Sequence, residues 1–439
     1  MDVREPELRR LLQRDIERVV LDNGVKVWTE HVPRATSVAL GVWINAGSRY
    51  EDVNESGSTH LIQRTAFHGT SKRSAKKIAL AVKRFGGDVS ITTGRDYAGY
   101  LARVAPDDAN KALDLLADLA LRPALGRQSI AAEQSQILQE LREAEADPDV
   151  TLESMFLRSI WMDRGLSRPP RGRLLGFRGD TKVYDFKPRS LQRLHRESHH
   201  PGAITVTLSG RLRHDGIQKM ARKLFGPVLK PEKTASTLAT ACHRFVALRN
   251  RTEFPGVRMM LGFPACSASD LARHTAGLMG AILGGGPNSR LARHATDKTL
   301  RVQNAVSEIQ MFADTGVLAL RLKSKSNQAE RALDTMVAEL RSLTMKPVGE
   351  AELTNARQFR SVEMMKSIGS TTDRIRDLAR QERYFGGLVD FGDECEKLNS
   401  VTAEEVQRQS AGWIAPHTLS LAALGDLDGV RLAPESLRW

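Results

Sequence analysis

The pattern of apolar and polar positions at the start of the chain predicts β-structure. Apolar residues and one glycine fill Val38–Ile44, which is typical of a strand covered on both faces, and Gly47 follows as a stop signal. An Asn-Gly pair within Leu21–Val25 supplies the positive φ values of a tight turn and predicts a hairpin. Residues 6–20 have the spacing of an amphipathic helix, and another helix is expected near Ser58.

A pattern in the first half of the chain recurs in the second half. Residues 98–104 have the composition of a strand and are followed by an amphipathic helix at 112–119. The same succession returns at 315–322 and 332–340. In length, each half matches a single domain. The repeat therefore predicts an α+β fold class with two homologous α/β domains.

A stretch without clear periodicity separates the two halves. Residues 230–240 are rich in Pro, Thr and Ser, a composition typical of a linker. We therefore expect an N-terminal domain at 1–229, a linker at 230–243 and a C-terminal domain at 244–439.

Composition and charge narrow the class of protein. The 439 residues are 41% hydrophobic and 27% charged, so the chain can bury a core. The net charge of +13 favours anionic surroundings such as acidic lipid, nucleic acid or an acidic partner. Three dispersed cysteines support neither a disulfide framework nor a structural zinc site, and no apolar run is long enough to cross a bilayer. Five acidic residues among the first twenty are atypical of a mitochondrial presequence, so such a signal has been removed or never existed.

The most specific motif is the pentad His-Leu-Ile-Gln-Arg that begins at His60. It resembles the zinc helix of the inverzincin metallopeptidases, whose H-x-x-E-H motif holds Zn²⁺ with two histidines and uses the glutamate as general base. The resemblance assigns His60 to the first ligand, while Gln63 replaces the base and Arg64 replaces the second ligand. It also assigns Glu140, on a later helix, to the third ligand and Glu133 to a supporting acidic position.

These replacements argue against a zinc ion at the site. One histidine and one carboxylate fall short of the three protein ligands of a catalytic zinc, and the cation of Arg64 repels a metal. The amide of Gln63 cannot take a proton from water near neutral pH. We therefore expect no metal, no cofactor and no peptidase chemistry, with Arg64 paired to Glu140 and Glu133 in place of the ion. His60 is then expected to be a hydrogen-bonded helix residue without a ligand role.

A glycine-rich segment marks the second half. Gly284, Gly285 and Gly286 look like the substrate-binding glycine segment of the same family, and such glycines permit close approach to a substrate chain or a neighbouring strand. No Lys-Ser/Thr pair follows them, which argues against a phosphate loop. Active relatives grip a peptide with an Arg and, about seven residues later, a Tyr, but this chain has Ala295 or Thr296 at the first position and Val302 or Gln303 at the second. We interpret the segment as a vestigial substrate-binding loop.

Two further motifs have a structural interpretation. His195 and His199 are spaced for one helix face, but Pro201 follows directly, so both are expected at a solvated helix end. The basic stretch 168–173 lacks aromatic residues for stacking on bases. This composition favours contact with solvent, lipid or a partner over a nucleic-acid site.

The resemblance is strongest to mitochondrial members of the family. Residues 21–27, 41–51, 137–141 and 312–316 are similar to the processing peptidase subunits and to the core proteins of ubiquinol-cytochrome c reductase, above all to the first core protein. For the fold, the resemblance implies the pitrilysin-like arrangement, in which each domain is a mixed sheet flanked by helices.

For function, the resemblance implies a non-catalytic core subunit, and hence not an enzyme, that supports assembly and stability of the respiratory complex. The implied partners are a homologous second core subunit, cytochrome b, cytochrome c1 and the iron-sulfur subunit. Anionic lipid is a further expected contact, and nucleic acid is not. The implied location is the matrix side of the mitochondrial inner membrane.

Two alternatives stay open. The chain is either the non-catalytic partner subunit of a heterodimeric processing peptidase that binds presequences, or a free-standing bacterial-type homologue. The net charge of +13 matches basic presequences poorly and lowers the weight of the first alternative.

Overall fold

The computed structural model describes residues 14–162, 164–172, 186–229, 242–295 and 302–438. The chain forms two compact units, each made of three segments. The segments are Met1–Arg142, Arg168–Leu238 and Lys366–Gly392 in unit 1, and Glu143–Ser167, Ala239–Met365 and Asp393–Trp439 in unit 2.

Unit 1 is built on a six-stranded mixed sheet with the order β1-β2-β6-β3-β5-β4. β2 and β6 run parallel, and the other neighbours run antiparallel. β3 is buried along its whole length, as its run of apolar residues predicts for a central strand. The strands are β1 (Asp15–Val20), β2 (Lys26–His31), β3 (Val38–Ile44), β4 (Val89–Thr93), β5 (Ala98–Val104) and β6 (Ile204–Gly210).

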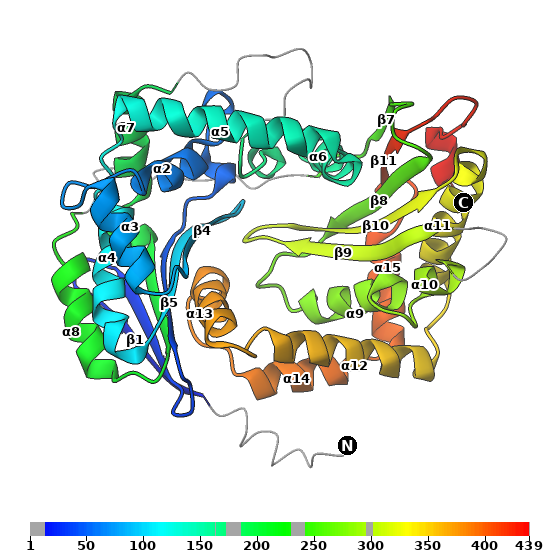
Figure 1. Cartoon of the computed structure of the whole chain (residues 1–439). Coiled ribbons are helices and arrows are strands. Elements are labelled where there is room, and N and C mark those ends of the chain that lie inside the picture. The colour runs from blue at the N-terminus through cyan, green and yellow to red at the C-terminus, as the bar shows by residue number, and fades with distance from the viewer. Residues whose placement is uncertain (1–13, 163, 173–185, 230–241, 296–301, 439) are drawn as a thin grey trace. The chain divides into compact units, whose positions relative to one another are not determined.

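Helices flank this sheet and carry the candidate site (Figure 1). α4 and α8 pack on it through an aliphatic core that includes Leu40, Leu113 and Leu224. The helices are α2 (Ser58–Ala66), α3 (Ala75–Arg84), α4 (Ala109–Leu121), α5 (Arg127–Ala146), α7 (Pro188–Ser198), α8 (His214–Phe225) and α13 (Thr371–Phe385). Short 3-10 helices are η1 (Ser48–Tyr50), η2 (Val53–Glu55), η3 (Pro106–Asp108) and η5 (Pro201–Ala203).

Unit 2 is built on a five-stranded mixed sheet with the order β7-β11-β8-β10-β9. The strands are β7 (Val246–Asn250), β8 (Val257–Ala265), β9 (Gln303–Met311), β10 (Gly316–Ser324) and β11 (Ser420–Gly425). The helices are α6 (Pro148–Ile160), α9 (Arg273–Gly284), α10 (Arg290–Ala295), α11 (Ala329–Met345), α12 (Glu350–Lys366), α14 (Phe391–Ser400) and α15 (Ala403–Trp413). Its 3-10 helices are η4 (Gly165–Ser167), η6 (Ser326–Gln328) and η7 (Pro434–Leu437).

The two units repeat one arrangement of strand and helix. β5 is followed by η3 and α4, and β10 is followed by η6 and α11. Each of these strands lies second from one edge of its sheet, with antiparallel neighbours on both sides. The predicted fold class is therefore confirmed: two α/β domains, each a mixed sheet flanked by helices.

Two helices, α6 and α13, do not belong to the unit that contains their neighbours in the sequence. α13 packs on β3 and β6 of unit 1, and α6 packs on β8 and β11 of unit 2. The domain boundaries predicted from the sequence divide the chain into two continuous halves, so they place α6 in the N-terminal domain and α13 in the C-terminal domain. The predicted linker lies outside the described residues, apart from its last two residues, Cys242 and His243.

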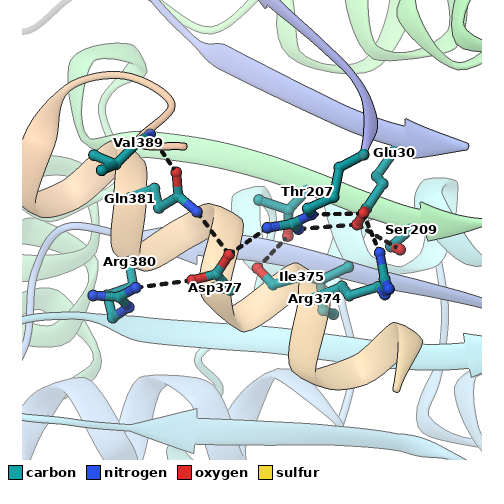
Figure 2. A network of polar contacts seen from close by, with 10 residues as sticks. Glu30, Thr207, Ser209, Arg374, Ile375, Asp377, Arg380, Gln381 and Val389 are labelled. Carbon is teal, nitrogen blue, oxygen red and sulfur yellow. Dashed lines mark hydrogen bonds and ion pairs between the residues drawn. The ribbon is translucent and has the colours of Figure 1, made fainter. Parts of the chain in front are cut away.

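A buried polar network ties α13 to the sheet of unit 1 (Figure 2). Glu30 of β2 accepts hydrogen bonds from Arg14 at 2.7 and 3.0 Å, from Ser209 at 3.0 Å and from Arg374. Arg14 also donates to Asp377 of α13 at 2.6 Å. Burial raises the pKa of Glu30, but the bonds and charges of the two arginines outweigh this effect, and the net result is a lowered pKa.

The start of the chain differs in part from its predicted structure. Residues 15–20, expected within an amphipathic helix, form strand β1 instead, because they pair along their whole length with β2. Residues 1–13 lie outside the described part of the chain. The predicted hairpin is confirmed, with Gly24 in its turn at a φ of 98°. Among the described residues, no helix is long and apolar enough to cross a membrane.

Candidate functional site

The candidate site is built around α2, whose start is fixed by a buried carboxylate. Gly57 precedes the helix with a φ of 91°. Glu51 accepts hydrogen bonds from the backbone N–H groups of Gly57 at 2.7 Å and Thr59 at 2.8 Å, so it satisfies donors that the first turn leaves free. Burial raises the pKa of Glu51 to about 7, against the lowering effect of these bonds.

His60 and Gln63 join α2 to the edge of the sheet. The hydroxyl of Thr93 donates to Oε1 of Gln63 at 2.6 Å and lies 2.9 Å from Nδ1 of His60. Because the one hydroxyl proton of Thr93 is donated to Gln63, Nδ1 of His60 donates to the hydroxyl oxygen. Nε2 of His60 then carries a lone pair without a hydrogen-bond partner. Gln63 also donates to the carbonyl of Gly99 at 2.9 Å. Burial, and next the charge of Arg64, lower the pKa of His60 to about 4, so its imidazole is neutral at pH 7.

Arg64 bridges α2 and α5. Its guanidinium donates to Glu133 at 2.6 Å, to Glu140 at 2.6 Å and to Gln136 at 2.8 Å. His68 lies 2.6 Å from the second oxygen of Glu133. The pairing of Arg64 with Glu140 and Glu133 that the charge balance predicts is present, and it brings these three predicted site residues into one cluster. The other two, His60 and Gln63, share Thr93 as a partner.

The residues present do not fit the zinc ion that an H-x-x-E-H site holds. Nε2 of His60 is buried without a hydrogen-bond partner and is free to coordinate, but it is one ligand. The carboxylates of Glu133 and Glu140 are bound to a fixed guanidinium, which repels a dication. Within the described residues, no group of three or more His, Cys, Asp or Glu side chains could hold a metal.

The glycine-rich segment lies in unit 2, and its glycines are required by packing. A Cβ on Gly284 would lie 2.3 Å from the backbone nitrogen of Ser307 on β9, and one on Gly285 would lie 2.6 Å from Cα of Ala281. Gly286 has a φ of 150° and faces the ring of Phe359. Close approach to a neighbouring strand, one of the two uses predicted for these glycines, is therefore observed; the predicted vestigial role toward a substrate stays a prediction.

The predicted solvated helix end at His195 and His199 is wrong. His199 is buried, and the two rings stack with centroids 4.1 Å apart. Burial lowers the pKa of both imidazoles. The sequence suggested exposure because Pro201 follows, but the chain turns inward there. In the basic stretch, the carbonyl of Arg168 accepts a hydrogen bond from Ser48 at 2.7 Å; residue 173 lies outside the described part.

Several residues of the site were not predicted from the sequence. Glu51, Thr93, His68 and Gln136 complete the hydrogen-bond pattern around α2. Gln136 and Glu140 are one turn apart on a helix, a spacing from which the sequence could have signalled a shared partner. Thr93 carries no such signal, because its role depends on the pairing of β4 with β5.

The fold and the altered zinc helix define a protein of the metallopeptidase class, with two homologous α/β domains. The profile described as insulinase (peptidase family M16) matches residues 26–172, and the peptidase M16 inactive domain matches residues 185–359. Together they span well over half of the chain. The chain therefore belongs to peptidase family M16.

Curated relatives of similar length come from bacteria. The uncharacterized zinc protease SCO5738 of Streptomyces coelicolor is 26% identical and covers 94% of this chain and 90% of its own length. The uncharacterized zinc protease YmxG of Bacillus subtilis is 26% identical and covers 89% of this chain and 94% of its own length. These relatives are bacterial zinc proteases rather than mitochondrial core proteins, so the narrower mitochondrial assignment is not shown by sequence.

Solved structures share the fold at low sequence identity. A protease from Helicobacter pylori has a TM-score of 0.85 and 19% identity, and covers 94% of this chain and 100% of its own. A chain of complex III2 from Candida albicans has a TM-score of 0.83 and 15% identity, and covers 96% of this chain and 100% of its own. Both likenesses show the fold.

The expectation that the chain is not an enzyme is contradicted by these relatives. Proteins that match nearly its whole length are named zinc proteases, and its first domain matches the insulinase profile. The expectation inferred that the whole protein is inactive from the replacement of two side chains on one helix. The chemistry at α2 and the activity of the protein are separate questions.

Proposed function

We propose that this chain is a peptide-binding subunit of an M16-type zinc peptidase made of two homologous chains, in which the partner chain holds the metal. The observation that carries the proposal is the guanidinium of Arg64, bound to both Glu133 and Glu140 at 2.6 Å. The cluster is electrostatically satisfied by an arginine where a peptidase places its dication. Family membership and the zinc-protease relatives support a role in peptide hydrolysis.

An open sheet edge beside α2 supports the binding of an extended peptide. β4 ends the sheet of unit 1 and pairs with β5 on one side, among the strands that the structure describes. The bonds from Gly94 N–H to Tyr97 and from Arg103 N–H to Asp88 fix the antiparallel alternation. By that alternation the N–H and C=O groups of Ile91 point to the open edge. A peptide strand added there would use these groups.

The experiment measures peptide hydrolysis by the assembled pair. Ile91→Pro removes an N–H at the open edge and leaves the bonds to β5 in place, whereas Ile91→Val keeps the N–H and serves as the matched control. We expect the proline variant to raise KM for a fluorogenic peptide about fivefold, with the control within about twofold of the parent, since one lost hydrogen bond is worth roughly 1 kcal/mol. A proline variant with unchanged KM and kcat would remove the peptide-binding role.

A second candidate is favoured by the likeness to a complex III2 chain. In this proposal the chain supports a respiratory complex, with a homologous core subunit, cytochrome b, cytochrome c1 and the iron-sulfur subunit as partners on the matrix side of the inner membrane. Its support is the shared fold. Co-purification with cytochromes from native membranes would favour this candidate over the peptidase pair.

A further inference from the structure

A cavity of about 810 Å³ opens on the helical layer of unit 1, and none of its lining residues belongs to the cluster around Arg64. Its walls come from the second half of α3, the first turns of α4 and the last turns of α8, helices that lie next to one another in Figure 1. Ligand-binding clefts typically measure roughly 300–1,000 Å³. The size therefore suits a ligand of moderate size or part of a larger one.

Apolar side chains form part of the cavity. Leu80, Phe85, Leu115, Met220 and Leu224 line it. Leu80 is 58% exposed on α3, among the more exposed large apolar side chains in the described residues. Covering such a side chain with an apolar ligand removes apolar surface from water, which is favourable. An occupant with an apolar portion is thus favoured over a purely polar ion.

Positive charge dominates the lining. One carboxylate, that of Asp114, faces six cationic side chains, which are Lys72, Arg73, Arg84, Lys111, Arg122 and Lys223. Arg73 and Arg122 are neutralised by aspartates of α4, and Lys111 by Asp108.

The other three cations lack a direct bond to a carboxylate, although the charge of Arg84 acts on Asp108 from a greater distance. The side chains of Lys72, Arg84 and Lys223 make neither a hydrogen bond nor an ion pair with any residue in the described part of the chain. Nη2 of Arg122 is also buried without a hydrogen-bond partner. The cavity therefore combines three positive side chains that are not held in an ion pair with an apolar surface, which is complementary to an anionic amphiphile.

We propose that this cavity binds an anionic phospholipid presented at a membrane surface, with Lys72, Arg84 and Lys223 on the phosphate and Leu80 against the acyl carbons. Exposed Lys76, together with the other lysines of α3, extends the positive surface next to the cavity. Basic residues at a membrane surface attract acidic lipid, and their contributions accumulate. This site is independent of the peptidase cluster.

The experiment uses the full chain with vesicles in about 0.15 M salt, where long-range attraction is screened. Sedimentation compares vesicles of phosphatidylcholine alone with vesicles that also contain an equal part of phosphatidylglycerol. We expect binding to the anionic vesicles to be at least tenfold stronger. Arg84→Glu with Lys223→Glu should lower that binding at least tenfold, and Leu80→Ser should lower it severalfold without a change of charge.

The control is Arg341→Glu with Lys346→Glu, a pair of exposed residues of unit 2 that changes the net charge by the same amount. The control should retain binding within about twofold. Equal loss in both double variants would mean that net charge alone drives binding and would overturn the site. Binding of inorganic phosphate that is sensitive to Arg84 and Lys223, without vesicle binding, would overturn the lipid. Circular dichroism verifies folding, and Arg84→Gln with Lys223→Gln replaces the double variant if it does not fold.

Discussion

At the scale of single residues, the site shows how an arginine takes the electrostatic place of a metal. The guanidinium of Arg64 donates to Glu133 and Glu140 from one plane, a geometry that a guanidinium offers and an ammonium does not. The cluster is therefore satisfied by protein atoms alone. What is left over is Nε2 of His60, buried and without a hydrogen-bond partner.

The first prediction is that Gln63→Glu combined with Arg64→His restores zinc binding. The change removes the guanidinium and leaves two imidazoles and Glu140, the number of protein ligands found in catalytic zinc sites. Coordination by Nε2 of His60 breaks no existing hydrogen bond. We expect close to one zinc per chain in metal analysis after dialysis. His60→Ala in the same background is the control; equal zinc contents in the two proteins would show that His60 and Glu140 do not converge.

The second prediction concerns the buried carboxyl group of Glu51. Its pKa is raised by burial to about 7, so the folded state binds a proton more tightly than the unfolded chain, whose ordinary value is 4.5. This contribution to stability is full below about pH 4.5 and is lost as the pH rises through 7. Between pH 5 and pH 8 we expect Glu51→Gln to gain about 1–3 kcal/mol relative to the parent in chemical denaturation. Exposed Asp52→Asn is the control, and it should not reproduce the gain of Glu51→Gln.

At the scale of elements, α13 is held to a sheet formed by residues more than a hundred and fifty positions earlier in the chain. Its apolar contacts involve Ile375 and Ala379 against Trp43. The polar contacts run through Glu30, which carries no exposed surface and is surrounded by arginines. Glu30 is therefore the buried carboxylate through which both Arg14 and Arg374 contribute to holding the helix on the sheet.

The third prediction is that Glu30→Gln destabilises the protein by about 3 kcal/mol at pH 7, because it leaves Arg14 and Arg374 buried or partly buried with one charge fewer. Since the pKa of Glu30 is lowered in the folded state, this contribution is present at neutral pH and fades as the pH falls below about 4.5. Urea denaturation measures the difference. Exposed Glu404→Gln on α15 should change stability by less than about 0.5 kcal/mol; an equal loss there would contradict the prediction.

Elements with a strong local pattern could be predicted from the sequence, and those set by distant contacts could not. β3 and the hairpin turn at Gly24 carry their own signals, and the repeat of strand and helix gave the two domains. Residues 15–20 look helical, but pairing with β2 decides their structure. The packing of α6 in unit 2 and of α13 in unit 1 could not be predicted from local periodicity, because it depends on which sheet has a surface that fits each helix.

The candidate site divides in the same way. The cluster of Arg64 with Glu133 and Glu140 could be predicted, since the family register places all three and opposite charges must balance. The buried environment of His199 and the link from Thr93 to His60 could not, because both depend on elements that meet only in the folded chain.

At the scale of the whole molecule, the fourth prediction follows from the exchanged helices. A fragment of residues 1–229, the predicted N-terminal domain, lacks α13 and uncovers Trp43 and Leu101. We expect it to be poorly soluble and to melt well below the full chain. Coexpression with residues 244–439, which contain α13, should restore soluble protein. A fragment that melts at the temperature of the full chain when produced alone would contradict the prediction.

The fifth prediction concerns the partner subunit of the chain. If the peptidase of this assembly has its metal in the partner, native purification through a tag on this chain should recover a homologous M16 chain with an intact H-x-x-E-H helix. Metal analysis should then give about one zinc per pair of chains. Stable subunit pairs of this kind bury more than about 2,000 Å², so the partner should survive gel filtration at micromolar concentration.

Three outcomes of that purification distinguish between the proposed functions. A zinc-bearing partner whose loss abolishes peptide hydrolysis supports the peptidase pair, and Ile91→Pro should then weaken hydrolysis without releasing the partner. Recovery with cytochrome b, cytochrome c1 and the iron-sulfur subunit supports the respiratory candidate instead. Recovery of this chain alone, with zinc bound and peptides cleaved, would contradict both, because the Arg64 cluster would then have to open and release Glu140 to a metal.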